Sequence, residues 1–326
     1  MMMNLRQLKN LVNETVRAEK NKRSTATRWN RIVESTTRKV LLEDADPAKV
    51  KLPMKLSDIV KQIGADKAKT QVKSGGPDKD GGPADDDVID TIDIGGGIPA
   101  AELKPSQSTM KVSKGIQFAF SSLMKVNPMF DGPGGDMGAI ISSDNHLMDG
   151  HHRWIATLMV DPSATCGGAK LDMPAKQLIG VLNLVTVGVF GRTAGNEGQG
   201  KFEDFNKDKM APIIKDILEN GYWAQSDASK CVEAAQKFLD TQESDVEKLS
   251  AAMAKKFEDN IVSSGDNWKT LPDGAPNRVE MPVINADEVG KAVEVLGSGE
   301  VDLSEPYANE SIDIRRWHKL AGILKD

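Results

Sequence analysis

The fold of this chain is decided by residues 144–154, which read DNHLMDGHHRW and hold three of its four histidines. The apolar run Gly138–Ile141 before them predicts a strand, and the run Trp154–Met159 after them predicts a helix. Gly150 therefore lies on a strand-to-helix turn, where it can adopt a positive φ. A helix N-terminus presents unpaired N–H groups and a positive dipole end. With Arg153 in its first turn, we predict a phosphate or carboxylate site here.

Composition excludes several classes of protein. With 39% hydrophobic residues and a mean hydropathy of −0.39, the 326-residue chain can form a packed core. Its net charge of −6 argues against nucleic acid binding by the whole surface but leaves a local basic patch open. No apolar run approaches about 18 residues, so no membrane partner is expected. Cys166 and Cys231 lack metal-ligand spacing, which favours reduced thiols and a cytoplasmic protein.

The chain divides into four predicted segments. Residues 1–63 form a basic amphipathic helical arm, in which residues 4–42 carry apolar positions at helical spacing between basic ones. Such an arm either docks to a larger assembly or nucleic acid, or packs on its own domain with a solvated face. Residues 64–97 are rich in Gly and Asp and predict a linker. An ordered domain over 98–200 and a mainly helical region over 201–326 follow.

The predicted fold class is α+β, with a small mixed sheet between the arm and the helical C-terminal region. Within residues 98–200 we expect a strand at Ile98–Leu103, a turn at Lys104–Gln107 and a helix at Lys111–Lys125. A hairpin then pairs Gly138–Ser142 with His146–Met148. The helix that opens at His151 completes this order of elements.

This order resembles the ParB/sulfiredoxin-like superfamily over residues 98–190, about a third of the chain. The matching residues are Leu103–Gln107 and Gly150–Arg153, with Ala156 following. The resemblance implies a first strand that runs into a Pro-containing turn. It also implies that the glycine–arginine signature opens the helix that holds nucleotide phosphates. The cofactor that it suggests is an NTP with Mg²⁺, and a kinase-like relative needs a carboxylate base.

The resemblance implies two sets of site residues. Asp149 and Glu102 are the candidates for a catalytic base, although Asp149 has a structural alternative as a helix cap. The residues predicted to bind phosphate or nucleotide are Gly150, His151, His152, Arg153, Lys104 and Gln107.

Departures from the superfamily and plain structural roles limit these assignments. His151 stands where sulfiredoxins have a cysteine, so their sulfinic acid chemistry lacks its nucleophile. His151 is alternatively a packed, hydrogen-bonded histidine, and Arg153 a member of a surface ion pair. Adjacent histidines on a helix diverge by about 100°, so no metal site is predicted. After residue 202 no basic recognition helix is evident, which argues against centromere binding.

The layout also resembles proteins of tailed bacteriophages, so two functions compete. The first is a nucleotide- or phosphate-binding protein, either a phosphotransferase or an NTP-dependent switch, with a nucleotide or phosphorylated small molecule as its partner. The second is a non-catalytic structural component of a phage particle that contacts other particle proteins through residues 4–42 and the C-terminal helices. Nucleic acid would bind only through the basic arm, and the expected location is the host cytoplasm or the virion.

Overall fold

A computed structural model of the chain describes residues 52–74, 89–93, 97–125, 136–196, 200–222, 227–285, 287–301 and 303. Contacts divide the chain into residues 1–46 and residues 47–326, and every described residue belongs to the second unit. Most of the predicted arm, residues 4–42 included, lies outside the described residues.

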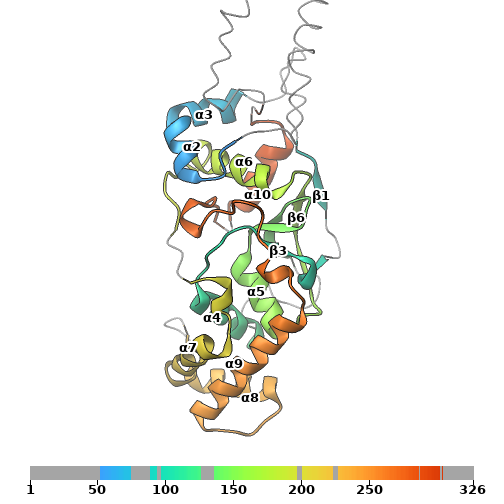
Figure 1. The fold of residues 1–326 in the computed structure, drawn as a ribbon, viewed down its shortest axis with the longest axis vertical. Helices are drawn as coiled ribbons and strands as arrows, with labels where there is room; N and C mark the ends of the chain where they lie inside the picture. The colour runs from blue at the N-terminus through green and yellow to red at the C-terminus, as the bar shows by residue number, and fades with distance from the viewer. Residues whose placement is uncertain are drawn as a thin grey trace, which may run out of the picture. The chain divides into compact units, whose positions relative to one another are not determined.

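A mixed sheet holds the second unit together, in the order β1-β6-β4-β5-β3, with β2 pairing separately with β6 (Figure 1). The pairs β3–β5 and β4–β6 are parallel, whereas β1, β2 and β5 pair antiparallel with their neighbours β6, β6 and β4. This confirms an α+β fold with a mixed sheet. The strands are β1 (Thr91–Asp93), β2 (Ile98–Pro99), β3 (Lys104–Pro105), β4 (Asp136–Ile141), β5 (His146–Asp149) and β6 (Thr165–Leu171).

The predicted hairpin is confirmed, but the prediction for residues 98–107 is wrong in detail. The chain leaves the sheet after Pro99, which has no N–H to donate, and turns through the 3-10 helix η3 (Ala100–Glu102). It returns at Lys104, whose N–H donates to the carbonyl of Asn145 at 2.9 Å. The segment expected to be a turn therefore supplies strand β3.

Helices predicted from apolar spacing form where expected around the sheet. The helix expected at Lys111–Lys125 is observed at Val112–Leu123, and the region expected to be mainly helical is confirmed, whereas the helix Ala65–Ser74 lies in the stretch predicted as a linker. Within the described residues, no helix is long and apolar enough to cross a membrane. The helices are α2 (Leu56–Gln62), α3 (Ala65–Ser74), α4 (Val112–Leu123), α5 (His151–Val160), α6 (Ala175–Gly188), α7 (Lys207–Asn220), α8 (Ala228–Leu239), α9 (Val246–Ser263) and α10 (Val289–Gly297).

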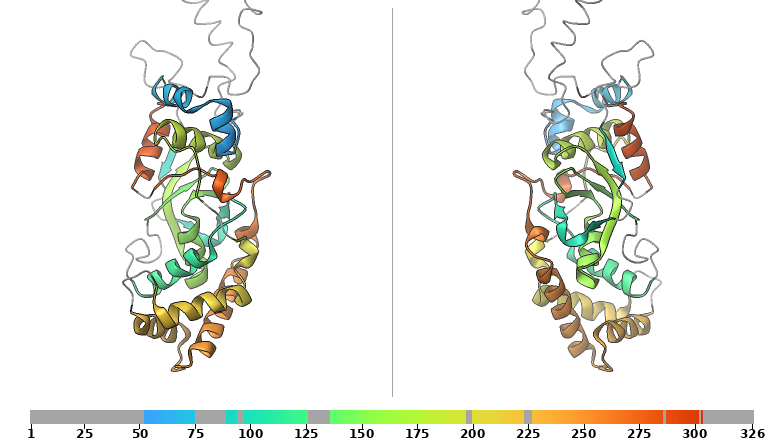
Figure 2. Two further views of the ribbon diagram at one scale, coloured as in Figure 1. Left: turned by 90° about the vertical axis from the view of Figure 1, so that its left-hand side faces the viewer. Right: turned by 90° about the vertical axis from the view of Figure 1, so that its right-hand side faces the viewer.

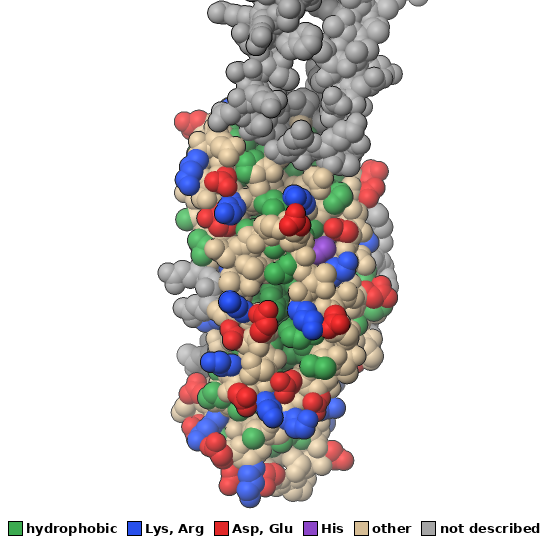
Figure 3. Space-filling view, in the orientation of Figure 1, with side chains coloured by type: hydrophobic (Ala, Val, Ile, Leu, Met, Phe, Trp, Pro, Cys, Tyr) green, Lys and Arg blue, Asp and Glu red, His purple; other side chains and the backbone are tan. Residues whose placement is uncertain are grey.

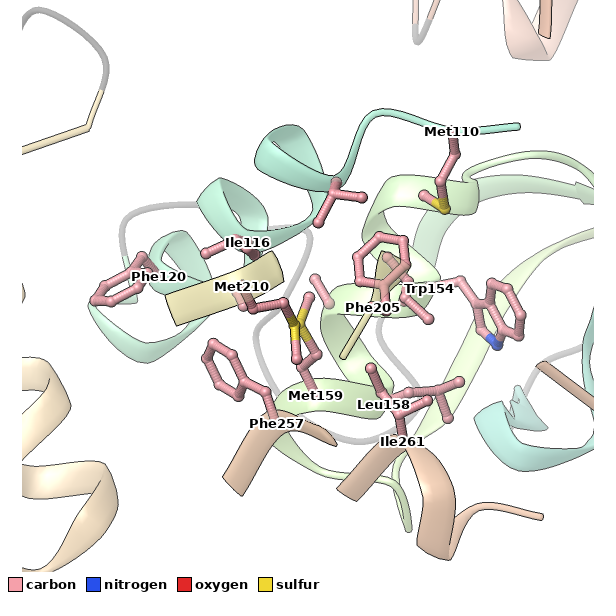
Figure 4. Close-up of a cluster of buried hydrophobic side chains, with 14 of the residues drawn as sticks. Met110, Ile116, Phe120, Trp154, Leu158, Met159, Phe205, Met210, Phe257 and Ile261 are labelled. Carbon is pink, nitrogen blue, oxygen red and sulfur yellow. The ribbon is translucent and has the colours of Figure 1, made fainter. Parts of the chain in front are cut away.

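One hydrophobic core joins helices α4 and α5 to the C-terminal helices α7 and α9 (Figure 4). Trp154, Met210 and Phe257 are fully buried in it, and burial of each large side chain contributes on the order of 1.5–3 kcal/mol. The amide of Asn260 on α9 donates to the carbonyl of Met159 on α5 at 2.6 Å. The core thus runs continuously across the boundary predicted at residue 200.

A second core lies on the opposite face of the sheet, where α6 packs against α2 and α3, and buried residues of α10 belong to the same core (Figure 2). The helices approach closely, because a Cβ on Gly188 of α6 would lie 2.6 Å from the carbonyl oxygen of Ala68 on α3. The segment predicted as a linker, 64–97, therefore contains a packed helix and strand β1. Its Ala68 and Val72 are buried, which is the apolar signal hidden among its polar residues.

Candidate anion-binding site

Helix α5 begins directly after strand β5 at Gly150, which has a φ of 97°. This confirms the predicted positive φ. Any other residue here would be strained at this φ, and its Cβ would lie 3.2 Å from the Cβ of Ala139. Gly150 occupies the N-cap position, and no side chain caps the helix. The alternative role of Asp149 as a helix cap is therefore wrong, because it stands one residue too early.

Helix α4 begins beside α5, because the strands before the two helices are parallel neighbours. Lys104 and Pro105 of β3 pair with His146 and Leu147 of β5, so both strands end at one edge of the sheet. Helix α4 follows β3 through a short turn, and α4 packs on α5. Its N-cap, Lys111, makes no side-chain cap, and neither helix has an acidic residue in its first turn. Two positive helix ends therefore lie beyond two parallel strands, a place where ligands commonly bind.

Arg153 forms the expected ion pair, but not at the surface. Its side chain is 10% exposed, and its Nη2 lies 2.9 Å from Oδ2 of Asp149. The same nitrogen lies 3.4 Å from the carbonyl oxygen of Gly138. The pair links the first turn of α5 to the end of β5 and to β4.

Further positive charges act on His152, which is next to Arg153 on α5. Burial, and after it the charges of Lys114, Arg278, Arg153 and Lys111 in that order, lower the pKa of His152 to about 3. The imidazole is therefore neutral at neutral pH. Its Nε2 is buried without a hydrogen-bond partner among the described residues. The four cations give the surroundings of His152 a positive electrostatic potential.

The cations Lys111, Lys114 and Arg278 lack matching carboxylates. Within the described residues, no carboxylate lies at ion-pair distance from any of the three. Partial burial and the charge of Arg278 lower the pKa of Lys114, while Asp149 raises it. Burial lowers the pKa of Arg278, and Asp149 opposes that shift. Asp149 is thus close enough to act on both cations, but it is already bonded to Arg153.

His151 has the structural role left open by the sequence. It is 3% exposed, and its Nε2 accepts a hydrogen bond from the N–H of Ser106 at 3.1 Å. Burial and the charge of Arg278 hold the pKa of His151 well below its ordinary range. A neutral ring that accepts at Nε2 ties the turn after β3 to the start of α5. These contacts favour the packed, hydrogen-bonded histidine over a phosphate ligand.

Gln107 reaches the site, whereas Glu102 does not. Gln107 is fully buried, its Oε1 accepts a hydrogen bond from Nη1 of Arg278 at 3.2 Å, and its Nε2 has no partner among the described residues. Lys104 is half-buried on β3, the strand that leads to Gln107. Glu102 is exposed on η3, and no polar contact in the described part of the chain joins it to Asp149 or Arg153.

Sequence reasoning missed Lys111, Lys114 and Arg278. The sequence could have indicated the two lysines, because they lie at the start of a predicted helix. A helix N-terminus with nearby cations favours an anion at α4 as it does at α5. Arg278 carries none, because it lies in a turn-rich stretch far along the chain and only the fold brings it to Gln107.

The donor set fits a phosphate group better than a metal ion. Guanidinium, ammonium and backbone N–H groups bind phosphate oxygens. No group of three or more His, Cys, Asp or Glu residues that could hold a metal occurs in the described ranges. Burial raises the pKa of Cys166 to about 12, so this thiol stays protonated at neutral pH and offers no nucleophile.

Comparisons with known proteins add no family to this geometry. No protein-family model, no curated protein and no solved structure matches the chain. The resemblance to the ParB/sulfiredoxin-like superfamily stays a prediction that rests on the residues quoted for it.

Proposed function

We propose that this protein binds a nucleotide or another phosphorylated small molecule where helices α4 and α5 begin. One observation carries the proposal: Lys111, Lys114 and Arg278 gather at two uncapped helix N-termini, and no carboxylate in the described part of the chain lies at ion-pair distance from them. Cations brought together in a partly buried place repel one another, and a bound dianion offsets that repulsion. This is the site that the resemblance predicts for nucleotide phosphates.

The contacts support binding more directly than group transfer. Asp149 already accepts from Arg153, and Glu102 is exposed without a contact to the site, so neither is placed as a general base. If the ligand is an NTP with Mg²⁺, the helix ends and the free cations would hold its phosphates. The ion would supply further neutralisation of charge on the phosphate oxygens.

The alternative function, a structural component of a phage particle, depends on residues 4–42 and on the C-terminal helices. Residues 4–42 lie outside the described residues, and nothing in the C-terminal helices tests this function, so it stays a prediction.

The proposal is tested by a thermal-shift panel of ATP, CTP, GTP, ADP and inorganic pyrophosphate, with and without Mg²⁺. The full chain is needed, because α2 and α3 pack into the second core and a truncation at residue 98 would remove them. A ligand at about 100 times its Kd adds roughly 2.7 kcal/mol of stability, a shift that is readily measured. No shift with any of these phosphates would overturn the proposal.

Two arginine variants separate binding from folding. Arg153→Gln should weaken binding of the responding phosphate at least tenfold, about 1.4 kcal/mol. It also leaves Asp149 without its partner, so each variant is compared with its own ligand-free melting temperature. Arg192→Gln is the matched control, since Arg192 forms a two-bond ion pair with Glu288 at 2.6 Å on another part of the fold. An unchanged affinity in Arg153→Gln would remove Arg153 from the site.

A further inference from the structure

Residues 276–280, here called the strap, run from the turn before α4 to the second core. Figure 1 shows this segment in orange after α9, crossing between α5 and α6. At its first end the carbonyl of Pro276 accepts from the N–H of Ser108 at 2.9 Å, and the N–H of Arg278 donates to Oγ1 of Thr109 at 3.0 Å. Both partners belong to the turn that leads into α4. The strap is therefore docked on one wall of the anion site.

The two ends of the strap are held differently. At the far end, Glu280 accepts from the N–H and the hydroxyl of Ser57 at 2.8 and 3.0 Å, and Met281 directly after it is fully buried. Near the site, Val279 is 42% exposed, and Arg278 is held by hydrogen bonds to Thr109 and Gln107. The far end is thus anchored in a core, whereas the end beside α4 is docked mainly through hydrogen bonds that water can replace.

Arg278 determines how Gln107 presents its amide. Nη1 of Arg278 donates at 3.2 Å, so the amide atom facing it is the acceptor Oε1, because the opposite orientation would bring two donors together. The Nε2 group of Gln107 is thereby turned away from Arg278, and it is buried with no hydrogen-bond partner among the residues that the structure describes. A buried donor without an acceptor costs about 1–3 kcal/mol, which a ligand oxygen would recover.

The strap also lies directly on Gly195, which carries no charge and no side chain. A Cβ on Gly195 would come within 1.9 Å of the carbonyl oxygen of Val279 and 2.5 Å of its carbonyl carbon. These are backbone atoms, so an alanine here forces the strap and the segment of Gly195 apart. The contact offers a way to lift the strap without removing a polar group.

We infer that the strap closes over the phosphate ligand, with Arg278 binding the anion directly and holding Gln107 as a second donor. The inference rests on the proposed function and names the element that completes that site. Docking brings a guanidinium to a partly buried place where no described carboxylate lies at ion-pair distance and where Asp149 is already bonded to Arg153. This is unfavourable unless an anion shares the place. Ligand binding and docking of the strap therefore favour each other.

Inorganic pyrophosphate is the probe, titrated by calorimetry on the full chain, with hydrogen exchange of residues 276–280 measured with and without it. In the wild type, pyrophosphate should slow exchange of the N–H of Arg278, which is bonded to Thr109. Gly195→Ala and Arg278→Gln should each weaken pyrophosphate at least tenfold and remove that protection. Gly290→Ala is the matched control, because a Cβ there meets nothing within 4 Å, and its affinity should match the wild type.

The outcomes separate the two proposals. If the wild type binds pyrophosphate and both strap variants bind it equally well, the inference is overturned and the proposed function stands. Loss of affinity in Arg278→Gln alone, with Gly195→Ala unchanged, overturns closure by the strap and keeps Arg278 as a ligand. If Gly195→Ala lowers the melting temperature too far for titration, Arg278→Gln with hydrogen exchange decides. A wild type that binds no phosphate overturns both.

Discussion

The N-termini of α7, α8 and α9 differ from those of α4 and α5. Each of the three C-terminal helices opens on a side chain that accepts a backbone hydrogen bond: Asn206 from Lys209, Asp227 from Ser229, and Asp245 from Lys248. Helices α4 and α5 open on Lys111 and Gly150, which make no such bond. One group of helices satisfies its own ends. At α4 and α5, no N-cap side chain accepts a hydrogen bond from the first N–H groups of the helix.

The surrounding charges follow the same division. On the C-terminal helices, Lys215 lies 2.5 Å from Glu247 and Lys255 lies 2.8 Å from Asp259. Figure 3 shows acidic and basic side chains interspersed over that end of the described unit. At α4 and α5 the cations outnumber their partners. Helices α2, α6 and α10 also lack a side-chain cap from their N-cap residues, so α4 and α5 are distinguished by the cations Lys111, Lys114 and Arg278 beside their uncapped ends.

The largest effect is expected from reversing one charge at the open helix ends. Lys114 is exposed, so Lys114→Glu should fold, yet it places a carboxylate among the cations that we propose to hold the anion. Pyrophosphate affinity should fall by roughly thirtyfold, about 2 kcal/mol. The same change on α7, Lys215→Glu, should leave the affinity within about twofold. Equal losses in the two variants would show general repulsion rather than a site.

An intermediate effect is expected from pH. Because the pKa of His152 falls from 6.5 to about 3 on folding, the unfolded chain binds a proton that the folded chain does not between those values. Stability is therefore present above about pH 6.5 and is lost as the pH falls toward 3. Urea unfolding should show this loss as about 1.4 kcal/mol per pH unit from His152.

Two measurements test whether His152 causes that pH dependence. His152→Gln should reduce the slope, and the remaining slope should include His151, whose pKa is lowered in the same direction. Saturating pyrophosphate should also reduce it, since an anion beside Lys114 and Arg278 favours the protonated ring. If neither His152→Gln nor saturating pyrophosphate changes the slope, His152 is not the source of the pH dependence and does not lie beside the bound anion.

The smallest effect concerns a capped helix. Asp245→Ala removes the side chain that accepts from the N–H of Lys248, and loss of an N-cap costs about 1 kcal/mol. The melting temperature should fall while the pyrophosphate affinity stays unchanged. A change in affinity would mean that the two groups of helix ends are coupled, which would weaken the contrast between them.

Local patterns predicted much of the fold. Apolar spacing located α4, α7, α8 and α9, and alternation with turn residues located the hairpin of β4 and β5, because these depend on neighbours within a few residues. The pattern failed at Lys104–Pro105, where two residues form a strand only because β5 lies beside them. It failed again at α3, whose Ala68 and Val72 are too few to signal a helix without α6 to bury them.

The candidate site divides in the same way. The sequence by itself determined that Gly150 turns the chain, that α5 begins there, and that Arg153 stands in its first turn, since each is a property of adjacent residues. Only the tertiary structure decided that His151 is buried against Ser106, that α4 starts beside α5, and that Arg278 reaches Gln107. Burial and the approach of distant charges arise from packing between elements, and no spacing along the chain encodes them directly.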